Sequence, residues 1–123
     1  MDLAIATRDD GDATVVALSG ELDIASADGL REHLAGLLAG GHIRIVVDLA
    51  ALAFCDSTGL STFVRASHGA VEQGGYLRLA APNGHVARVL SIVGLLDLFP
   101  TYRTVDGARH ADVGALVPPA VLG

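Results

Sequence analysis

A strand pattern followed closely by a helix pattern places residues 56–60 at a strand-to-helix junction. Residues 43–49 are apolar and β-branched, which is typical of a buried strand. Apolar side chains then recur on one helical face, at Leu60, Phe63, Val64 and Val71. A short loop joins the two patterns, and Ser57 lies at its end. Because the backbone N–H groups of a helix N-terminus favour a phosphate, the Ser57 hydroxyl could be a covalent switch.

The same residues are also typical of an ordinary helix cap. Asp and Ser are among the commonest N-cap residues, and such a cap contributes about 1 kcal/mol without any further role. The spacing alone therefore leaves both interpretations of Asp56 and Ser57 open.

Strand and helix patterns alternate along the rest of the chain. The expected elements are strands at residues 3–7, 14–19 and 43–49, a helix from Ser26 to Gly40, a helix from Ser57 to Gln73, a strand at residues 76–80, a helix from Pro82, a strand at residues 101–104 and a helix at residues 107–116. A loop at residues 20–23 is expected to separate the second strand from the first helix. This order predicts an α/β fold with a mainly parallel sheet, to which the opening hairpin adds an antiparallel strand.

Length and composition predict one small domain. The chain has 123 residues, and its 51% hydrophobic content is enough for one compact core. We expect no membrane span, because polar residues and glycines break the apolar runs well before the roughly 18 residues that a spanning helix needs. The chain starts without a signal-peptide pattern, so a cytoplasmic protein is expected.

The charge of the chain argues against nucleic acid as a partner. The net charge is −6, and all eight basic residues are Arg. Binding to nucleic acid depends on clustered Lys and Arg side chains that neutralise phosphates. We therefore expect a protein partner.

Enzyme and metal patterns are missing around Ser57. No G-x-S-x-G elbow surrounds it, and no residue stands out as its base. The absence of Lys argues against a phosphate-binding loop and against Asp56 as the phosphoacceptor of a receiver domain. The five histidines lack metal-binding spacing, and the lone Cys55 is expected to be a small buried thiol. No catalysis, cofactor or metal is expected.

Two sequence blocks resemble the signature of a known family. They are Leu18-Ser-Gly-Glu-Leu-Asp23 and, after a strand that ends Val47-Asp48-Leu49, Phe54-Cys-Asp-Ser-Thr-Gly-Leu60. Their order and spacing are similar to those of STAS domains, specifically the bacterial anti-sigma factor antagonists. The resemblance covers about residues 3–113 and implies a single domain, residues 1–123, with helices mainly on one face of a mixed sheet. Two prolines predict that the tail at residues 117–123 is frayed.

The resemblance implies a regulator that switches partners. In this family the unmodified protein binds an anti-sigma factor and so releases a sigma factor for transcription. The anti-sigma factor is usually a serine kinase whose phosphorylation of the antagonist ends the association, and a serine phosphatase resets the switch. The resemblance assigns Ser57 as the phosphoacceptor, with a partner-binding surface at Asp56, Thr58, Gly59, Leu60, Glu21 and Asp23. The phosphate would add negative charge beside Asp56 and near Asp48.

Other interpretations stay open. Thr58 and Ser61 could be alternative acceptors, and Ser61 stands where many relatives have Gly. A STAS domain can also be a structural subunit of a signalling scaffold or a transport complex. In that case Leu60, Phe63 and the apolar C-terminal third would form a constant interface. The sequence does not decide whether the free protein is a homodimer.

Overall fold

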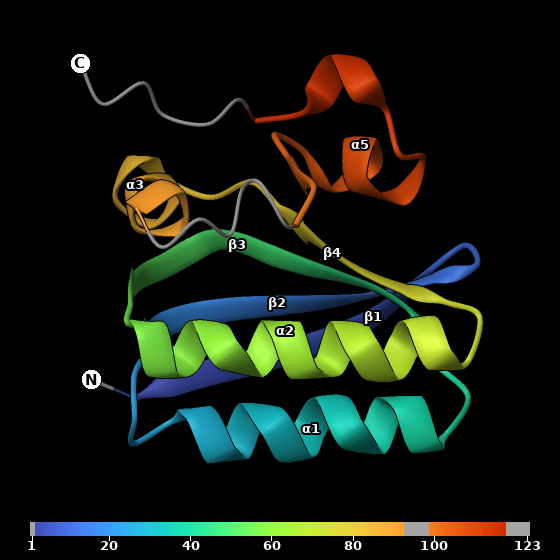
Figure 1. Ribbon diagram of the computed structural model, residues 1–123, viewed down its shortest axis with the longest axis horizontal. Helices are drawn as coiled ribbons and strands as arrows, with labels where there is room; N and C mark the ends of the chain where they lie inside the picture. Colours follow the sequence, from blue (N-terminus) through green and yellow to red (C-terminus); the bar gives the residue numbers. More distant parts are fainter. Residues whose placement is uncertain (1, 93–98, 118–123) are drawn as a thin grey trace.

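Figure 1 shows the computed structural model, which describes residues 2–92 and 99–117. Its strands are β1 (Leu3–Asp10), β2 (Ala13–Leu22), β3 (Arg44–Cys55), β4 (Tyr76–Ala80) and β5 (Thr101–Tyr102). Its helices are α1 (Ala27–Ala39), α2 (Ser57–Glu72), α3 (Gly84–Ile92), α5 (Val105–Arg109) and the 3-10 helix η1 (Val113–Ala115). No helix in these described ranges combines the length and the apolar character that a bilayer crossing requires.

The strands form one mixed sheet in the order β1-β2-β3-β4-β5. β1 and β2 are an antiparallel hairpin, and every later strand pairs in parallel with its neighbour. The helical connections follow from this arrangement, because parallel strands cannot be joined by a tight turn. The expected α/β fold with an antiparallel opening hairpin is confirmed.

The two long helices cover one face of the sheet. Figure 1 shows α1 and α2 side by side, on the opposite side of the sheet from α5. Alternate side chains of the strands point into the main core beneath these helices, among them Val16, Leu18, Ile45, Val47, Leu77 and Leu79. The helices contribute Leu30 and Leu34 from α1 and Leu60 and Phe63 from α2. Apolar burial of this face is the main stabilising contribution to the fold.

A smaller apolar cluster lies on the other face of the sheet. Val15 and Val46 point away from α1 and α2 and are buried with Tyr102 and with Ala108 of α5. The short α5 therefore adds a partial second layer. This agrees with the expectation that helices lie mainly on one face.

The strands β2 and β3 are longer than the sequence predicts. Their last residues pair with each other, Glu21 with Phe54 and Leu22 with Cys55, after register shifts near Gly20. Gly20 has φ of +97°, which suits glycine at such an irregularity. The loop expected at residues 20–23 is therefore wrong up to Leu22, and the loop expected after residue 49 is wrong up to Cys55.

The C-terminal third also differs from the prediction. In place of one helix at residues 107–116, α5 ends at Arg109 and η1 starts at Val113. Ala111 between them has φ of +50°, which interrupts a right-handed helix. Val117 donates its backbone N–H to Thr101 O, so the first residue of the expected frayed tail is paired. The rest of that tail, residues 118–123, lies outside the described residues.

One predicted member of the buried face of α2 is wrong. Val71 is exposed, whereas its neighbour Ala70 is buried. Ala70 follows Phe63 by seven residues and points in nearly the same direction, whereas Val71 is turned about 80° away from Phe63, at the edge of the buried face.

Candidate functional site

The N-terminus of α2 is capped by Asp56 rather than by Ser57. The Asp56 carboxylate accepts a hydrogen bond from the backbone N–H of Gly59 at 2.8 Å, and the Asp56 backbone is extended. Ser57 is the first residue of the helix, and its side chain is exposed. Its hydroxyl forms no hydrogen bond with any residue in the described ranges. The cap interpretation thus applies to Asp56, and the Ser57 hydroxyl is accessible.

The end of β2 holds this turn in place. The backbone N–H of Asp56 donates to Leu22 O at 3.1 Å. A Cβ added to Gly59 would lie 2.5 Å from Leu22 Cγ, so a larger residue at position 59 would collide with Leu22. The two sequence blocks that carry the resemblance are therefore in direct contact.

Asp23 forms the neighbouring turn, which leads from β2 into α1. Its Oδ1 accepts from the backbone N–H groups of Ala25 and Ser26 at 3.0 and 3.1 Å. Ser26 occupies the expected N-cap position, but its hydroxyl donates to Glu21 O at 2.9 Å and does not cap the helix. Asp23 thus orders the turn next to the Ser57 end of the sheet.

The predicted site residues fall into two groups by exposure. Ser57 and Thr58 are exposed, and Asp56, Glu21 and Asp23 are half-buried. Gly59 and Leu60 are buried, Leu60 with only 1% of its surface accessible. In this conformation Leu60 supports the turn from the core and has no surface to offer a partner. Phe63, which the structural-subunit interpretation also requires at an interface, is fully buried.

Asp48 does not belong to this site. It pairs with Ala17 and Ala80 within the sheet, and its carboxylate accepts from Ala50 N at 3.0 Å. It precedes Asp56 by eight residues, which is about 25 Å along a strand. The expectation that a phosphate on Ser57 would lie near Asp48 is therefore wrong, because β3 continues well beyond Asp48.

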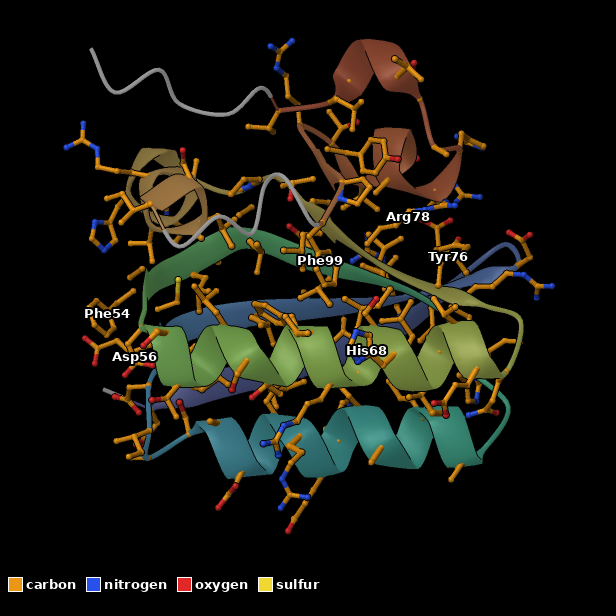
Figure 2. All side chains as sticks on the ribbon, viewed as in Figure 1. Phe54, Asp56, His68, Tyr76, Arg78 and Phe99 are labelled. Atoms are coloured by element: carbon orange, nitrogen blue, oxygen red, sulfur yellow. The ribbon has the colours of Figure 1, made fainter. Side chains whose placement is uncertain are left out.

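Two exposed apolar side chains flank the turn. Ile24 follows Asp23 and is 75% exposed, and Phe54 precedes Cys55 and is 39% exposed. Figure 2 shows Phe54 beside Asp56 at this end of the sheet. The Phe54 ring stacks on the His85 ring of α3, with centroids 6.1 Å apart. Neither residue was predicted to be exposed at the site, although Phe54 lies within the second sequence block.

The site contains one thiol, which is buried. Cys55 is buried at the end of β3. Burial, and to a smaller extent the adjacent Asp56 carboxylate, raise the pKa of the Cys55 thiol from 9.0 to about 11. The thiol is therefore protonated at neutral pH, and the predicted small buried thiol is confirmed.

The site has the character of a binding surface. Within residues 2–92 and 99–117, no group of three or more His, Cys, Asp or Glu side chains is placed to hold a metal ion. The geometry provides an exposed hydroxyl at a helix N-terminus, two ordered acidic turns and two exposed apolar side chains. Such a combination can bind a protein and change its affinity when the hydroxyl gains a charge.

Comparison with known proteins shows the family of this chain. The STAS domain family model matches residues 4–108. The anti-sigma-B factor antagonist of Bacillus subtilis (strain 168) is 33% identical over 108 residues, which are 87% of this chain and 97% of that protein. The crystal structure of an anti-sigma factor antagonist from Mycobacterium paratuberculosis is 27% identical with a TM-score of 0.81, covering 89% of this chain and 93% of that one.

A third comparison concerns the fold. The Bacillus cell fate determinant SpoIIAA in its phosphorylated form has a TM-score of 0.66 at 21% identity, covering 88% of this chain and 98% of that one. The similarity thus extends over nearly the whole length of each protein. The family match, the relatives and the contact between the two sequence blocks agree, and the chain belongs to the STAS domain family, among its anti-sigma factor antagonists.

Proposed function

We propose that this antagonist is controlled at Ser57. The unmodified protein binds an anti-sigma factor that is a serine kinase and thereby releases a sigma factor. Phosphorylation of Ser57 ends that association, and a serine phosphatase restores it. The protein acts in the cytoplasm and carries out no catalysis. The observation that carries this proposal is the exposed Ser57 hydroxyl, left free because Asp56 caps α2.

The electrostatics of the turn support a local switch. A phosphate adds about −1.5 to −2 charges at pH 7, here beside the Asp56 carboxylate in a protein of net charge −6. The N-terminus of α2 offers free backbone N–H groups and the positive end of the helix dipole, which stabilise the phosphate within the domain. The added charge therefore acts mainly on the partner, by repulsion of its acidic groups, and needs no refolding.

The neighbouring hydroxyls of Thr58 and Ser61 are less suitable phosphoacceptors than that of Ser57. The Ser61 hydroxyl donates to Thr58 O at 2.7 Å, so it is already engaged along the helix. Thr58 is exposed and is the next residue in the same helical turn. Thr58→Ala is therefore the matched control for Ser57→Ala in the test below. We propose Asp56, Thr58, Asp23 and Glu21 as the polar part of the binding surface, with Gly59 and Leu60 as its support.

The test is phosphorylation in a purified system. The protein is incubated with ATP and each purified anti-sigma kinase encoded in the same genome, and the intact mass and the modified residue are determined. We expect one kinase to add a single phosphate to the wild type and to Thr58→Ala, and none to Ser57→Ala. Stable binding of an anti-sigma factor without modification of Ser57 would contradict the switch and favour a structural subunit.

A further inference from the structure

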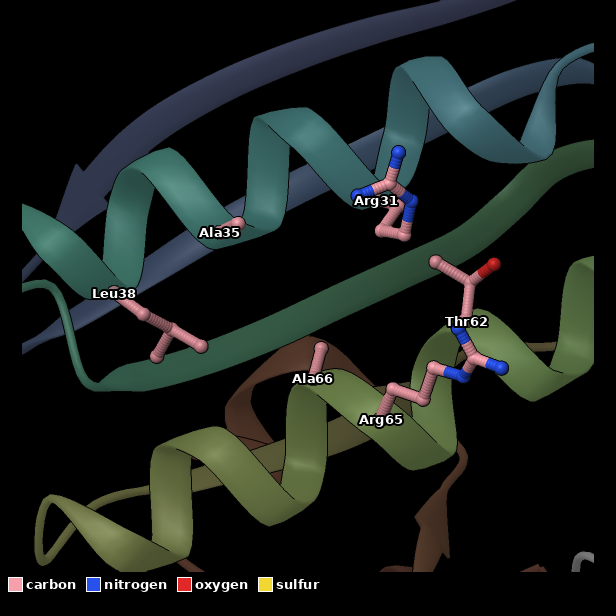
Figure 3. Close-up of a pocket in the computed structure, with 6 residues that line it drawn as sticks. All are labelled: Arg31, Ala35, Leu38, Thr62, Arg65 and Ala66. Atoms are coloured by element: carbon pink, nitrogen blue, oxygen red, sulfur yellow. The ribbon is translucent and has the colours of Figure 1, made fainter.

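A groove of about 150 Å³ lies between α1 and α2. It is lined by Arg31, Ala35 and Leu38 from α1 and by Thr62, Arg65 and Ala66 from α2. Figure 3 shows Arg31, Thr62 and Arg65 near one end of the groove and Leu38 near the other. The groove exists because the small side chains of Ala35 and Ala66 leave space between the two helices.

The two arginines of this groove are available to a partner. Arg65 is exposed and forms no ion pair or hydrogen bond with any residue that the structure describes. Arg31 pairs with Asp28 at 3.5 Å, but both side chains are solvent-exposed. Such an exposed pair contributes at most about 1 kcal/mol and is easily exchanged for another. Two cations therefore face an apolar groove on a protein whose net charge is −6.

The arginine end of the groove is the end nearer Ser57. Arg65 follows Ser57 by eight residues on α2, which is about 12 Å along the helix. Successive steps of four residues lead from Ser57 through Ser61 to Arg65, which is turned about 80° around the helix axis from Ser57. Arg65 thus lies between Ser57 and the part of the groove lined by Thr62 and Ala66, so a protein that covers Ser57 can extend over Arg65 into the groove.

We propose that the groove binds an acidic segment of the anti-sigma factor. One apolar side chain of that segment enters between α1 and α2, and its flanking carboxylates pair with Arg31 and Arg65. The volume favours a single side chain, because sites for small molecules are usually larger than about 300 Å³. This inference rests on the proposed function and names the chemistry of the partner surface that the Ser57 switch controls.

The proposal also explains the direction of the switch. Arg31 and Arg65 attract the acidic segment, whereas a phosphate on Ser57 places negative charge about 12 Å from Arg65 along α2. The phosphate then opposes the attraction on which the complex depends. A partner that presented a basic segment to this surface would instead be held more tightly after phosphorylation.

Charge reversal at the groove is the direct test. Arg31→Glu and Arg65→Glu are compared with Arg44→Glu, which makes the same charge change at the start of β3, at the end of that strand remote from Ser57. The dissociation constant is measured for the purified anti-sigma factor that phosphorylates the wild type. We expect each groove variant to weaken binding by about tenfold or more, and Arg44→Glu to change it less than about threefold. Urea denaturation checks that all three variants fold.

A second pair of variants tests the apolar part of the groove without changing charge. Ala35 is exposed in the groove wall, and Ala39 is exposed one turn later outside it. We expect Ala35→Phe to block the groove and weaken binding by about tenfold, and Ala39→Phe to leave it unchanged.

The outcomes separate this inference from the proposed function. If the wild type binds and is phosphorylated on Ser57 but the groove variants behave like Arg44→Glu and Ala39→Phe, the groove proposal is overturned and the switch stands. If no anti-sigma factor binds the wild type, the proposed function fails, and the groove proposal fails with it.

Discussion

Leu22 packs against Gly59 so closely that a Cβ on Gly59 would lie 2.5 Å from Leu22 Cγ and 3.1 Å from Leu22 O. This contact joins the end of β2 to the first turn of α2. Together with the hydrogen bond from Asp56 N to Leu22 O, it sets where Ser57 emerges from the surface. The position of the phosphoacceptor therefore depends on a strand that lies more than thirty residues earlier in the chain.

Gly59→Ala should destabilise the protein because of this contact. The new methyl group must displace Leu22, and such overpacking typically costs about 1–3 kcal/mol of the free energy of unfolding. Urea denaturation of the wild type and the variant measures the cost. Gly36→Ala is the matched control, since it lies in α1 with no atom within 4 Å of the added Cβ. Gly36→Ala should stabilise the helix by about 0.5–1 kcal/mol. Equal effects of the two variants would contradict the close packing.

Asp56→Ala should lower the free energy of unfolding by about 1 kcal/mol. The change removes the side chain that caps Gly59 N, and loss of an N-cap has this typical cost. Asp56→Asn retains an oxygen acceptor and should lose much less. Ser57→Ala should be within about 0.5 kcal/mol of the wild type, because the exposed hydroxyl is not the cap. A loss from Ser57→Ala as large as that from Asp56→Ala would show that Ser57 shares the capping role.

Cys55 should react with iodoacetamide only slowly in the native protein below about pH 10. The thiol is buried and its pKa is raised to about 11, chiefly by burial and then by the Asp56 carboxylate, so little thiolate forms at lower pH. The alkylation rate is measured from pH 7 to pH 11, with protein unfolded in urea as the control. Asp56→Asn should shift the native profile toward lower pH. A native profile that levels off near pH 9 would contradict the raised pKa.

The same shift predicts how stability depends on pH. A pKa raised in the folded state means that folding favours the protonated thiol, so its contribution is complete below the unfolded pKa near 9 and is lost as the pH rises through about 11. Cys55→Ala should therefore lose less stability than the wild type between pH 9 and pH 11. The free energy of unfolding of both proteins across this window tests the prediction, and parallel curves would contradict it.

Arg78→Ala should loosen the contact between β4 and α5. The Arg78 guanidinium lies 3.6 Å from the centre of the Tyr76 ring, and its Nη1 donates to Ala108 O at 2.9 Å. Figure 2 shows Tyr76 and Arg78 together below α5. Loss of both contacts should cost about 1–3 kcal/mol. Arg88→Ala is the control, because Arg88 is exposed on α3 and has no polar partner among the described residues.

The alternation of elements was predictable from the sequence because it depends on local patterns. The strand pattern at residues 76–80 predicts β4 with its observed bounds, Tyr76–Ala80. The glycines at positions 40 and 74 mark where α1 and α2 end. The ends of β2 and β3 were not predictable, since Glu21 and Phe54 are strand residues only through their pairing with each other. In the C-terminal third, Ala111 has a positive φ just after the C-cap of α5, where Asp112 N donates to Gly107 O. This local helix end usually takes Gly, so Ala111 gave no sequence signal for it.

The sequence predicted which residues belong to the candidate site but not which of them are exposed. The sequence blocks around Asp23 and Ser57 mark the residues that the structure brings together at one end of the sheet. Exposure could not be read from them, because Leu60 belongs to the buried face of α2 while Thr58 faces solvent. The exposure of Ile24 and Phe54 was not predicted, because large apolar side chains are usually buried and no pattern around these two indicates otherwise.

The affinity of one anti-sigma factor for the unmodified and the Ser57-phosphorylated protein tests the central claim most directly. Isothermal titration of both forms, prepared from one batch with the kinase that phosphorylates Ser57, gives the two dissociation constants. We predict that phosphorylation weakens binding by at least about a hundredfold, since it places about two negative charges in the interface. Equal dissociation constants for the two forms would contradict a switch at Ser57.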